Sequence, residues 1–400
     1  MHIVVIWQRF LPYHVARLTH LAQKLAEAGH RLTAVEVAVD DHSYGFPDAS
    51  SKEKEFEHVC CFGGSSYHDH RSREIFKAVS AVLEKISPDV VLAPATPFPE
   101  GMAAVVYRCR FAKRVVMMDD AWEYVDKSGL LERSIKRQIH QNIDAAFIPA
   151  PSHRDYFREI GFPADRIVCG VDVVDNEYFW SEAESARKKE KEWRQSLSLF
   201  KNYFLFVGRF IEKKGIEDLI ASYSAYRTAV EDPWDLVCVG AGPDMDATRK
   251  RAADMEGIQI VGPRHDDTLC VHYALASVLV VPSRCDQWCL VINEGLASGL
   301  PVIASRGCGA AQTLVREGEN GWIFDPGDTS ELSAVMQRAS TLPSEGLRRM
   351  GDRSRAIVAE WSLDRFAEGV LEALKISRRA SAGVISNLLV KLWKGHIIIT

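Results

Sequence analysis

Short apolar runs alternate with helical stretches along nearly the whole chain, and this alternation strongly constrains the fold. In the first half, strands are expected at residues 2–7, 31–39, 57–62, 89–93, 114–118 and 145–148. In the second half, they are expected at residues 203–207, 236–239, 258–261, 278–282, 301–304 and 321–324. Parallel strands that are buried on both faces have this continuous apolar character and are joined by helices. The chain is therefore predicted to form two doubly wound α/β domains.

Length and composition exclude several other classes of protein. The 400 residues suffice for two domains with separate cores, and the net charge of −5 argues against a nucleic-acid binder. The nine cysteines are odd in number and scattered, so neither a disulfide framework nor a metal site is expected. The apolar start of the chain is too short for a signal peptide, and no apolar run is long enough to span a bilayer. We therefore expect a cytoplasmic protein.

Two carboxylates flank the expected start of a helix in the second half. Asp286 follows the apolar run 278–282, and Glu294 stands eight positions later in a helix expected to begin near Trp288. At the rise of a helix, the two side chains would lie about 12 Å apart, with unsatisfied N–H groups of the first turn between them. Such N–H groups suit a diphosphate, and the carboxylates suit sugar hydroxyls. The spacing fits a nucleotide sugar; the alternative is an ordinary amphipathic helix with one exposed Glu.

Further motifs occur on either side of this stretch. Arg209 and Lys214 follow the apolar run 203–207 and precede a helix expected from residue 216, and the sequences VCVGAGPD and GENGWIFDPGD come later. With the Asp286–Glu294 stretch, these motifs resemble the C-terminal half of glycosyltransferase family 4, in the order of that family and over residues 202–328. The resemblance implies the GT-B fold, in which two Rossmann-like domains with doubly wound parallel sheets face each other across a cleft. It also implies transfer with retention of configuration.

The resemblance implies four parts of the chain. Residues 1–176 would form an acceptor-binding domain, 177–360 a nucleotide-sugar-binding domain, and 361–378 a helix that crosses back to the first domain. Residues 379–400 would form a basic amphipathic tail, because Leu, Val, Trp and Ile are mixed there with Lys and Arg. This tail either lies on a membrane surface, as a peripheral contact, or packs on the protein.

The resemblance also assigns roles in a donor site. The implied donor-binding residues are Gly208, Arg209, Lys214, Gly240, Pro263, Arg264, Asp286, Trp288, Cys289, Leu290 and Glu294. Arg209 and Lys214 would stabilise the diphosphate leaving group without a metal, because a planar guanidinium and a mobile ammonium together match its oxygens. Glu294 would hold the ribose and Asp286 the hexose. The chain departs from the family pattern beside the hexose, where Asp286 replaces Glu.

The acceptor side is also predicted. The glycine pair that many family members carry after the first strand is absent here, so the side chains of Arg9 and His14 would contact the acceptor instead. For His14 the alternative is an ordinary residue of the first helical turn. Asp120 follows the strand at 114–118 and is the candidate for positioning the acceptor hydroxyl.

The main hypothesis is a retaining transferase that moves a hexose from a nucleoside-diphosphate sugar to a saccharide or lipid-linked acceptor, in cell-envelope or exopolysaccharide synthesis. No cofactor and no metal are expected. Two alternatives are a GT-B nucleotide-sugar epimerase or hydrolase, and a non-catalytic subunit that binds nucleotide sugars, which the altered loop at residues 8–18 favours. An NAD or FAD enzyme is disfavoured, because Met245 stands where a dinucleotide fingerprint requires glycine.

Overall fold

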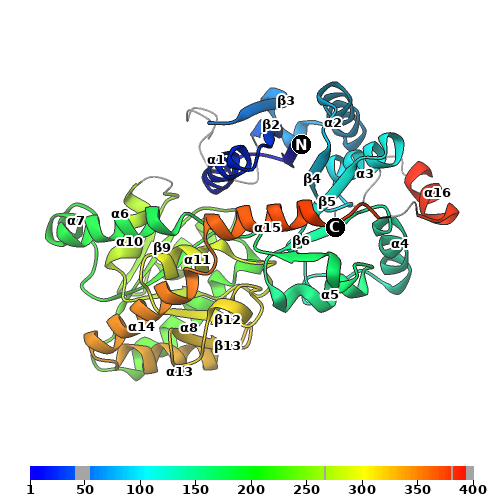
Figure 1. Ribbon diagram of the computed structural model, residues 1–400. Coiled ribbons are helices and arrows are strands. Elements are labelled where there is room, and N and C mark those ends of the chain that lie inside the picture. The colour runs from blue at the N-terminus through cyan, green and yellow to red at the C-terminus, as the bar shows by residue number, and fades with distance from the viewer. Residues whose placement is uncertain (41–54, 265–266, 380–381, 393–400) are drawn as a thin grey trace. The chain divides into compact units, whose positions relative to one another are not determined.

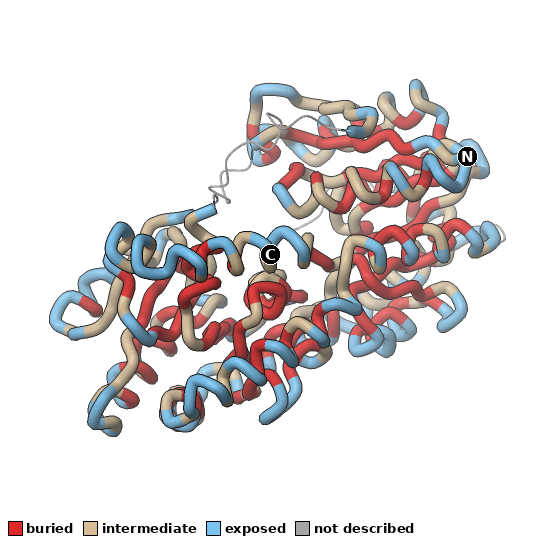
Figure 2. The backbone as a smooth tube through the Cα atoms, turned by 60° about the vertical axis from the view of Figure 1, so that its left-hand side comes forward, coloured by how far each residue is buried: buried red, intermediate tan, exposed pale blue. Residues whose placement is uncertain are grey.

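The computed structural model describes residues 1–40, 55–264, 267–379 and 382–392. The chain divides into two compact units, one formed by Met1–Val173 with Leu363–Thr400 and the other by Val174–Ser362. Each unit contains one parallel sheet with its own buried apolar core (Figure 1). Figure 2 shows the buried residues gathered in the strands and along one side of many helices.

Unit 1 holds a seven-stranded parallel sheet with the order β3-β2-β1-β4-β5-β6-β7. Its strands are β1 His2–Trp7, β2 Arg31–Asp40, β3 Glu57–Ser66, β4 Val90–Pro94, β5 Arg114–Met118, β6 Ala145–Ile148 and β7 Ile167–Cys169. Its helices are α1 Pro12–Glu27, α2 Ser72–Ile86, α3 Pro99–Phe111, α4 Leu130–His140, α5 Arg154–Glu159, α15 Leu363–Lys375 and α16 Val384–Leu392. The strand order reverses between β1 and β4, which are neighbours.

Side chains on both faces of this sheet are buried. Val4 and Ile6 join a core cluster with residues of α2 and α3, such as Val79. Ile3 and Val5 alternate with them, point to the other face, and are also fully buried. Burial on both faces explains why the strand sequence is a continuous apolar run rather than an alternating one.

Unit 2 holds a six-stranded parallel sheet with the order β10-β9-β8-β11-β12-β13. Its strands are β8 Tyr203–Val207, β9 Asp235–Val239, β10 Ile258–Val261, β11 Val278–Val281, β12 Val302–Ser305 and β13 Gly321–Phe324. Its helices are α6 Asn176–Lys188, α7 Glu190–Ser196, α8 Ile216–Ala229, α9 Met245–Ala252, α10 Asp267–Leu275, α11 Leu290–Ala297, α12 Ala311–Leu314, α13 Thr329–Ser340 and α14 Ser344–Val358. This is the strand order of a Rossmann-like sheet, and it reverses between β8 and β11.

The predicted α/β class with two Rossmann-like parallel-sheet domains is confirmed. The strand expected at 57–62 continues to Ser66, because its pairing with β2 extends beyond Phe62. The helix expected near Trp288 begins two residues later, at Leu290, because Cys289 has a left-handed φ of 80° that cannot belong to a helix. Of the tail at 379–400, residues 380–381 and 393–400 lie outside the described residues.

Candidate functional site

The loops that leave β8 and β11 bring a cation and a carboxylate together. Lys214 ends the short 3-10 helix Glu212–Lys214 that follows β8, and Asp286 follows β11. The Lys214 ammonium donates a hydrogen bond to Asp286 and forms an ion pair with it. Burial lowers the pKa of Lys214, but the Asp286 charge and hydrogen bond outweigh it, so the pKa is raised. Lys214 is therefore held as a cation at the point where strand order reverses, which is where open α/β sheets bind ligands.

Close backbone packing fixes the position of Lys214. The next residue, Gly215, has a φ of 69°, and a Cβ atom there would lie 2.1 Å from the carbonyl oxygen of Pro282. The backbone N–H of Arg284 donates to the carbonyl of Lys213 at 2.8 Å. Only glycine fits between these segments, so the lysine loop is held directly against the end of β11.

Glu294 lies in α11, and Tyr273 of α10 is its partner. The Tyr273 hydroxyl donates to Oε2 of Glu294 at 2.6 Å. Burial raises the pKa of the Glu294 carboxyl to about 7, against the opposing effect of the Tyr273 bond. The carboxyl therefore exchanges its proton near neutral pH, and it can accept a further hydrogen bond when ionised.

A loop that the sequence analysis did not single out supports the Asp286 segment. The N–H of Asp286 donates to the carbonyl of Gly307 at 2.9 Å, and the N–H of Gly309 donates back to the carbonyl of Asp286 at 3.2 Å. A Cβ atom at Gly307 would lie 2.5 Å from the carbonyl oxygen of Arg284. The sequence signal was present, since two glycines follow the strand at 302–305. They allow two loops to run in contact.

The predicted backbone donors at Trp288, Cys289 and Leu290 lie at the start of α11. The Trp288 side chain is buried, and its ring N–H donates to Oδ1 of Asn293 at 2.9 Å. The carbonyl of Trp288 accepts the N–H of Ala310 at 2.8 Å. The Trp288 side chain thus packs inside unit 2 and holds the start of α11 in place. Its backbone contacts the loop that contains Ala310.

Gly208 and Gly240 bring the ends of β8 and β9 into close approach. The N–H of Gly208 donates to the carbonyl of Val239 at 3.0 Å. Gly240 has a φ of 148°, and a Cβ atom there would lie 1.9 Å from the carbonyl oxygen of Gly208. Arg209 follows directly and is half-buried. The structure thus groups Gly208, Arg209 and Gly240 with Lys214 at the carboxyl ends of the strands.

Pro263 and Arg264 lie apart from this group. Both are exposed and follow β10, which β9 separates from β8 in the sheet. Their predicted contact with the nucleotide base stays a prediction.

In unit 1 the predicted residue His14 is bonded within its own helix. Its Nδ1 accepts the N–H of Leu11 at 3.1 Å, and its ring stacks on Trp7 with centroids 4.5 Å apart. Burial, and then the nearby Arg17, hold the pKa of His14 well below its usual value. His14 is therefore neutral and caps the first turn of α1, and its predicted contact with the acceptor stays a prediction.

Arg9 and Asp120 occupy different loops of unit 1. Arg9 is buried, and its Nη1 lies 3.8 Å from Oδ1 of Asp40. Asp120 follows β5 and is half-buried. Its negative charge acts to raise the pKa of Arg17. Arg17 itself was missed: it is buried in α1, and its Nε donates to the carbonyl of Val173 at 2.9 Å.

Glu100 is a second residue that the sequence analysis missed. It is fully buried in the first turn of α3, after β4, where strand order reverses in unit 1. The Tyr67 hydroxyl donates to its Oε2 at 3.1 Å, and burial raises the pKa of Glu100 to about 7. The signal in the sequence was its place in the loop PATPFPEG, directly after an expected strand.

Among the residues that the structure describes, no group of His, Cys, Asp and Glu side chains could hold a metal ion. Within the same ranges, no helix combines the length and the apolar character needed to cross a membrane.

Two parallel sheets of the Rossmann type, with a half-buried lysine and carboxylates at the reversal point of the second, fit the GT-B fold. Residues 201–341 match the sequence family described as glycosyl transferases group 1, and residues 14–169 match the glycosyl transferase 4-like domain. The chain belongs to glycosyltransferase family 4, as its motifs predicted.

Individual relatives carry the names of transferases for different sugars. The chain is 25% identical over 254 residues to a GDP-mannose-dependent alpha-(1-6)-phosphatidylinositol monomannoside mannosyltransferase of Mycobacterium tuberculosis, which covers 61% of this chain and 64% of that relative. It is 28% identical over 208 residues to sulfoquinovosyl transferase SQD2 of Arabidopsis thaliana, covering 50% of this chain and 38% of that relative. The chain thus spans less than two thirds of the length of these relatives.

Solved structures share the fold at low identity. Sucrose-phosphate synthase from Thermosynechococcus elongatus superposes with a TM-score of 0.73 at 20% identity, over 94% of this chain and 98% of that one. Anabaena HepE in complex with UDP-glucose superposes with a TM-score of 0.70 at 14% identity, over 94% and 99%. At these identities the similarity supports the fold alone.

Proposed function

We propose that this protein is a retaining hexosyltransferase that uses a nucleoside-diphosphate sugar as its donor. The observation that carries the proposal is the partly buried Lys214–Asp286 pair at the point where the strand order of unit 2 reverses. A lysine held as a cation beside helix-start N–H groups is suited to the charge that develops on a diphosphate leaving group. Glu294, buried on α11, supplies a nearby acceptor for sugar hydroxyls.

Within this proposal each donor residue has a physical task. Lys214 and Arg209 neutralise the diphosphate, and Glu294 accepts hydrogen bonds from the ribose. Asp286 accepts hydrogen bonds from the hexose once the diphosphate competes for Lys214. We propose no metal and no cofactor, because fixed cations and N–H groups perform the electrostatic task.

The proposed reaction keeps the configuration at the sugar carbon. The acceptor oxygen forms a bond to that carbon on the face from which the diphosphate leaves, while the carbon–phosphate oxygen bond breaks. The proton of the acceptor hydroxyl passes to the departing phosphate oxygen, so no protein base is required. Asp120, Arg9 and His14 remain proposed acceptor-side residues, and Asp120 would polarise the hydroxyl.

For the acceptor we propose a saccharide or a lipid-linked saccharide in cell-envelope or exopolysaccharide synthesis, on the cytoplasmic side. The name of the Mycobacterium tuberculosis relative, which combines a GDP-mannose donor with a phosphatidylinositol mannoside, supports this class. The UDP-glucose bound to Anabaena HepE supports a nucleotide-sugar donor.

The test is calorimetric titration of the full chain, without divalent metal, against UDP, GDP and ADP and their glucose, mannose and N-acetylglucosamine conjugates. We expect a clear preference for one nucleotide that is lost in Glu294→Ala. The exposed Glu345→Ala on α14 is the matched control and should bind as the wild type does. Binding of none of these ligands would refute the donor site.

Product analysis without an acceptor distinguishes the alternatives. An epimerase or hydrolase would convert the donor sugar on its own, whereas a transferase leaves most of it intact. Donor binding without turnover on any acceptor would instead favour a non-catalytic subunit.

A further inference from the structure

Helix α16 is turned so that most of its apolar side chains point away from the protein. It packs on α4 and α3 (Figure 1). The buried residues are Ser386 and Val390, and the exposed apolar residues are Val384, Ile385, Leu388 and Leu392, at 85%, 66%, 51% and 57%. A surface helix normally buries its apolar stripe. This helix therefore presents an apolar face without a partner in the described chain.

Hydrogen bonds hold α16 in this orientation. The Ser386 hydroxyl lies 3.1 Å from Oε1 of Gln138 and 3.0 Å from Oε1 of Gln141, both on or next to α4. Val390 adds an apolar contact, since it belongs to the core cluster of unit 1. The outward direction of the apolar side chains is thus a packed arrangement.

The apolar face continues onto α4. Leu131 and Ile135 precede Gln138 by seven and three positions, so they lie on the helix face that meets Ser386. Leu131 is 75% exposed. Leu130, Leu131, Ile135, Val384, Ile385, Leu388 and Leu392 are together called the α4–α16 face.

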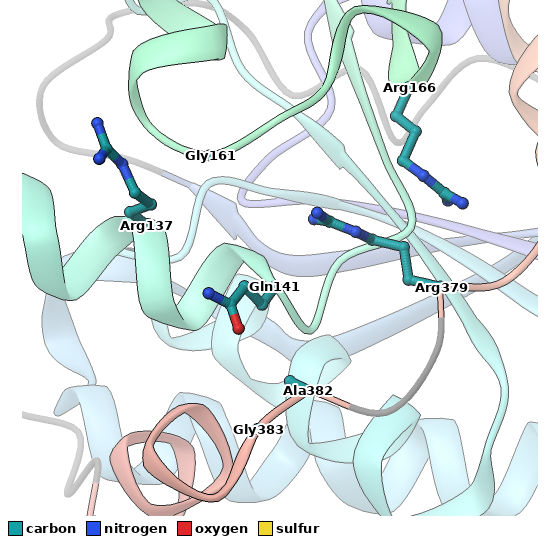
Figure 3. Close-up of a pocket in the computed structure, with 7 residues that line it drawn as sticks. All are labelled: Arg137, Gln141, Gly161, Arg166, Arg379, Ala382 and Gly383. Carbon is teal, nitrogen blue, oxygen red and sulfur yellow. The ribbon is translucent and has the colours of Figure 1, made fainter.

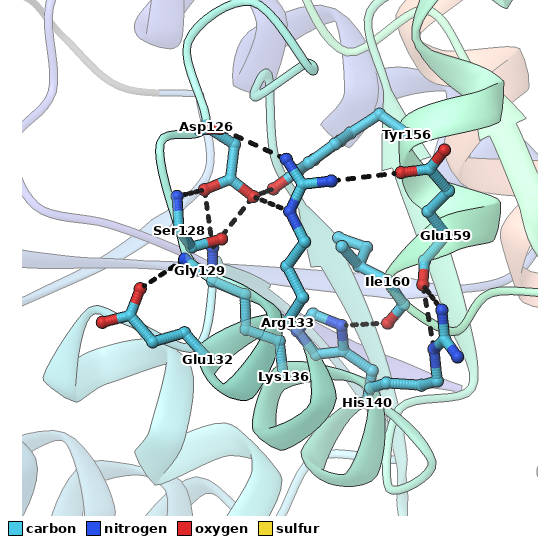
Figure 4. Close-up of polar contacts among 11 residues, drawn as sticks. Asp126, Ser128, Gly129, Glu132, Arg133, Lys136, His140, Tyr156, Glu159 and Ile160 are labelled. Atoms are coloured by element: carbon cyan, nitrogen blue, oxygen red, sulfur yellow. Dashed lines mark hydrogen bonds and ion pairs between the residues drawn. The ribbon is translucent and has the colours of Figure 1, made fainter.

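The opposite side of α4 binds the protein (Figure 4). Lys136 Nζ lies 3.2 Å from both carboxylate oxygens of Asp126, and Arg133 Nη1 donates to Glu159 at 3.3 Å. Asp126 also accepts the Tyr156 hydroxyl at 2.8 Å. Because the polar side of α4 is bonded inward, its leucines are directed outward.

A basic pocket of about 470 Å³ borders the start of α16. Arg137, Arg166 and Arg379 line it, together with Gln141, Gly161, Ala382 and Gly383 (Figure 3). In the described part of the chain, their guanidinium groups bond to backbone carbonyls rather than to carboxylates: Arg137 to Glu159, Arg166 to Asp144 and Ser377, and Arg379 to His140. Three positively charged side chains therefore line this pocket beside the apolar face.

The nearest buried carboxylate is already engaged. Asp144 accepts two N–H groups of Arg108 and the backbone N–H of Val115. Burial lowers the pKa of Arg379, and the charge of Arg166 lowers it further, while Asp144 and the neighbouring Asp165 raise it. An excess of positive charge around Arg379 would be relieved by an anion in the pocket.

We propose that the α4–α16 face is a membrane-docking surface whose occupant is a bilayer containing anionic phospholipid, with a headgroup phosphate in the pocket of Arg137, Arg166 and Arg379. Apolar side chains flanked by arginines match the acyl and headgroup layers of such a bilayer. A second copy of this chain is disfavoured as the occupant, because a symmetric contact would bring the same cations together. The proposal does not depend on the donor site, since docking requires no nucleotide sugar.

The test is flotation of the full-length protein with vesicles of phosphatidylcholine alone and of phosphatidylcholine mixed with phosphatidylglycerol. We expect binding to the mixed vesicles at low ionic strength and weaker binding at high ionic strength. Leu388→Glu should lower the partition coefficient by about tenfold or more, because a charge replaces an inserted side chain. Arg137→Gln should lower it about fivefold, the effect of one cation near an anionic surface.

Two variants in unit 2 are matched controls. Ala334→Glu on α13 adds the same charge at an exposed helical position, and Arg349→Gln on α14 removes an exposed arginine. Both should bind vesicles as the wild type does. Val384→Glu, at the exposed first turn of α16, replaces Leu388→Glu if that variant does not fold.

Four outcomes would overturn the proposal. These are no binding to mixed vesicles, equal binding to phosphatidylcholine alone, an equal loss in the unit 2 controls, and a soluble dimer seen by light scattering that Leu388→Glu dissociates while vesicle binding is absent. The last outcome would assign the face to a second copy of the chain.

Discussion

Lys214 and Asp286 are 72 residues apart in sequence and in direct contact in the structure. Each could be singled out from the sequence, because each stands in a loop directly after an apolar strand. Their contact could not be predicted, since it depends on the neighbouring positions of β8 and β11 in the sheet. In the structure the Lys214 ammonium, which we propose binds the diphosphate, is bonded to Asp286. Donor binding therefore requires Lys214 to exchange the Asp286 carboxylate for the diphosphate.

Replacing Lys214 tests this role. Lys214→Ala should lose about 2 kcal/mol or more of transition-state stabilisation, because a fixed donor to a charged leaving group is lost. This loss is measured as a fall in kcat/KM. Steady-state kinetics with the preferred donor would measure it. Lys213→Ala removes the exposed neighbouring lysine and should have little effect. Unchanged turnover of the Lys214 variant would contradict the assigned role.

Glu100 gives a prediction for stability against pH. Its pKa is raised from a usual value of about 4.5 to about 7 by burial, so the folded protein holds this proton more tightly than the unfolded chain. Stability from Glu100 is fully present below pH about 4.5 and is lost as the pH rises through about 7, by about 3 kcal/mol. Urea unfolding of the wild type and of Glu100→Gln at several pH values would measure it.

The expected result is that Glu100→Gln gains stability relative to the wild type as the pH rises over this interval. Glu345→Gln, at an exposed position of α14, should follow the wild-type curve at every pH. Parallel curves for Glu100→Gln and the wild type would show that Glu100 has an ordinary pKa.

Several functional candidates were accessible from sequence and others were not. Asp286 and Glu294 were found from their spacing, and Arg209 from its place after a strand. Arg17 and Glu100 were missed, because a charged residue inside a helix looks like a solvated one until the sheet buries it. Cys289 illustrates the limit for backbone shape: it has a left-handed φ of 80°, a conformation that favours glycine, and a cysteine in the sequence does not indicate it.

At the scale of elements, the strands were predictable because each is a short apolar run that is buried on both faces. The outward-facing side of α16 was not predictable. Its sequence VISNLLVKL is apolar around most of the helix, so the side that is buried depends on the contact of Ser386 with Gln138 and Gln141. Such contacts between distant segments are absent from any local pattern.

Asp144 joins three elements of unit 1. It lies just before β6 and accepts hydrogen bonds from Arg108 of α3 at 3.0 and 3.1 Å, from the N–H of Val115 of β5 at 2.8 Å, and from the N–H of Arg379 at 2.6 Å. Asp144 and Arg108 are each 2% exposed. This carboxylate therefore ties the segment after α15 to the sheet.

Asp144→Ala should destabilise unit 1 by about 3–5 kcal/mol, because it leaves the buried Arg108 without its partner. Chemical denaturation would measure the change. Asp155→Ala, at a position 89% exposed in α5, should change stability by no more than about 0.5 kcal/mol. A similar small effect in both variants would mean that the buried Asp144–Arg108 pair makes no net contribution to the free energy of unfolding.

At the scale of the whole molecule, each unit has its own core and the proposed donor site lies entirely within unit 2. A ligand that binds only the folded state raises stability by about 2.7 kcal/mol at one hundred times its dissociation constant. The preferred nucleoside diphosphate should therefore raise the unfolding temperature of unit 2 and leave that of unit 1 unchanged in scanning calorimetry.

Glu294→Ala provides the control, since its unit 2 transition should no longer respond to the nucleotide. A shift confined to the unit 1 transition would place the nucleotide site in the other unit and contradict the assignment.

Unit 1 is discontinuous in sequence, and this affects its folding during synthesis. On the ribosome, residues 1–173 emerge first, but α15 follows only after the whole of unit 2 has been translated. Phe366 of α15 lies 5.4 Å from the ring of Phe147 and 6.2 Å from that of Trp7, between ring centroids. The nascent chain therefore carries an uncovered aromatic surface around Phe147 throughout the translation of unit 2. The unit whose synthesis begins first is the last to be completed.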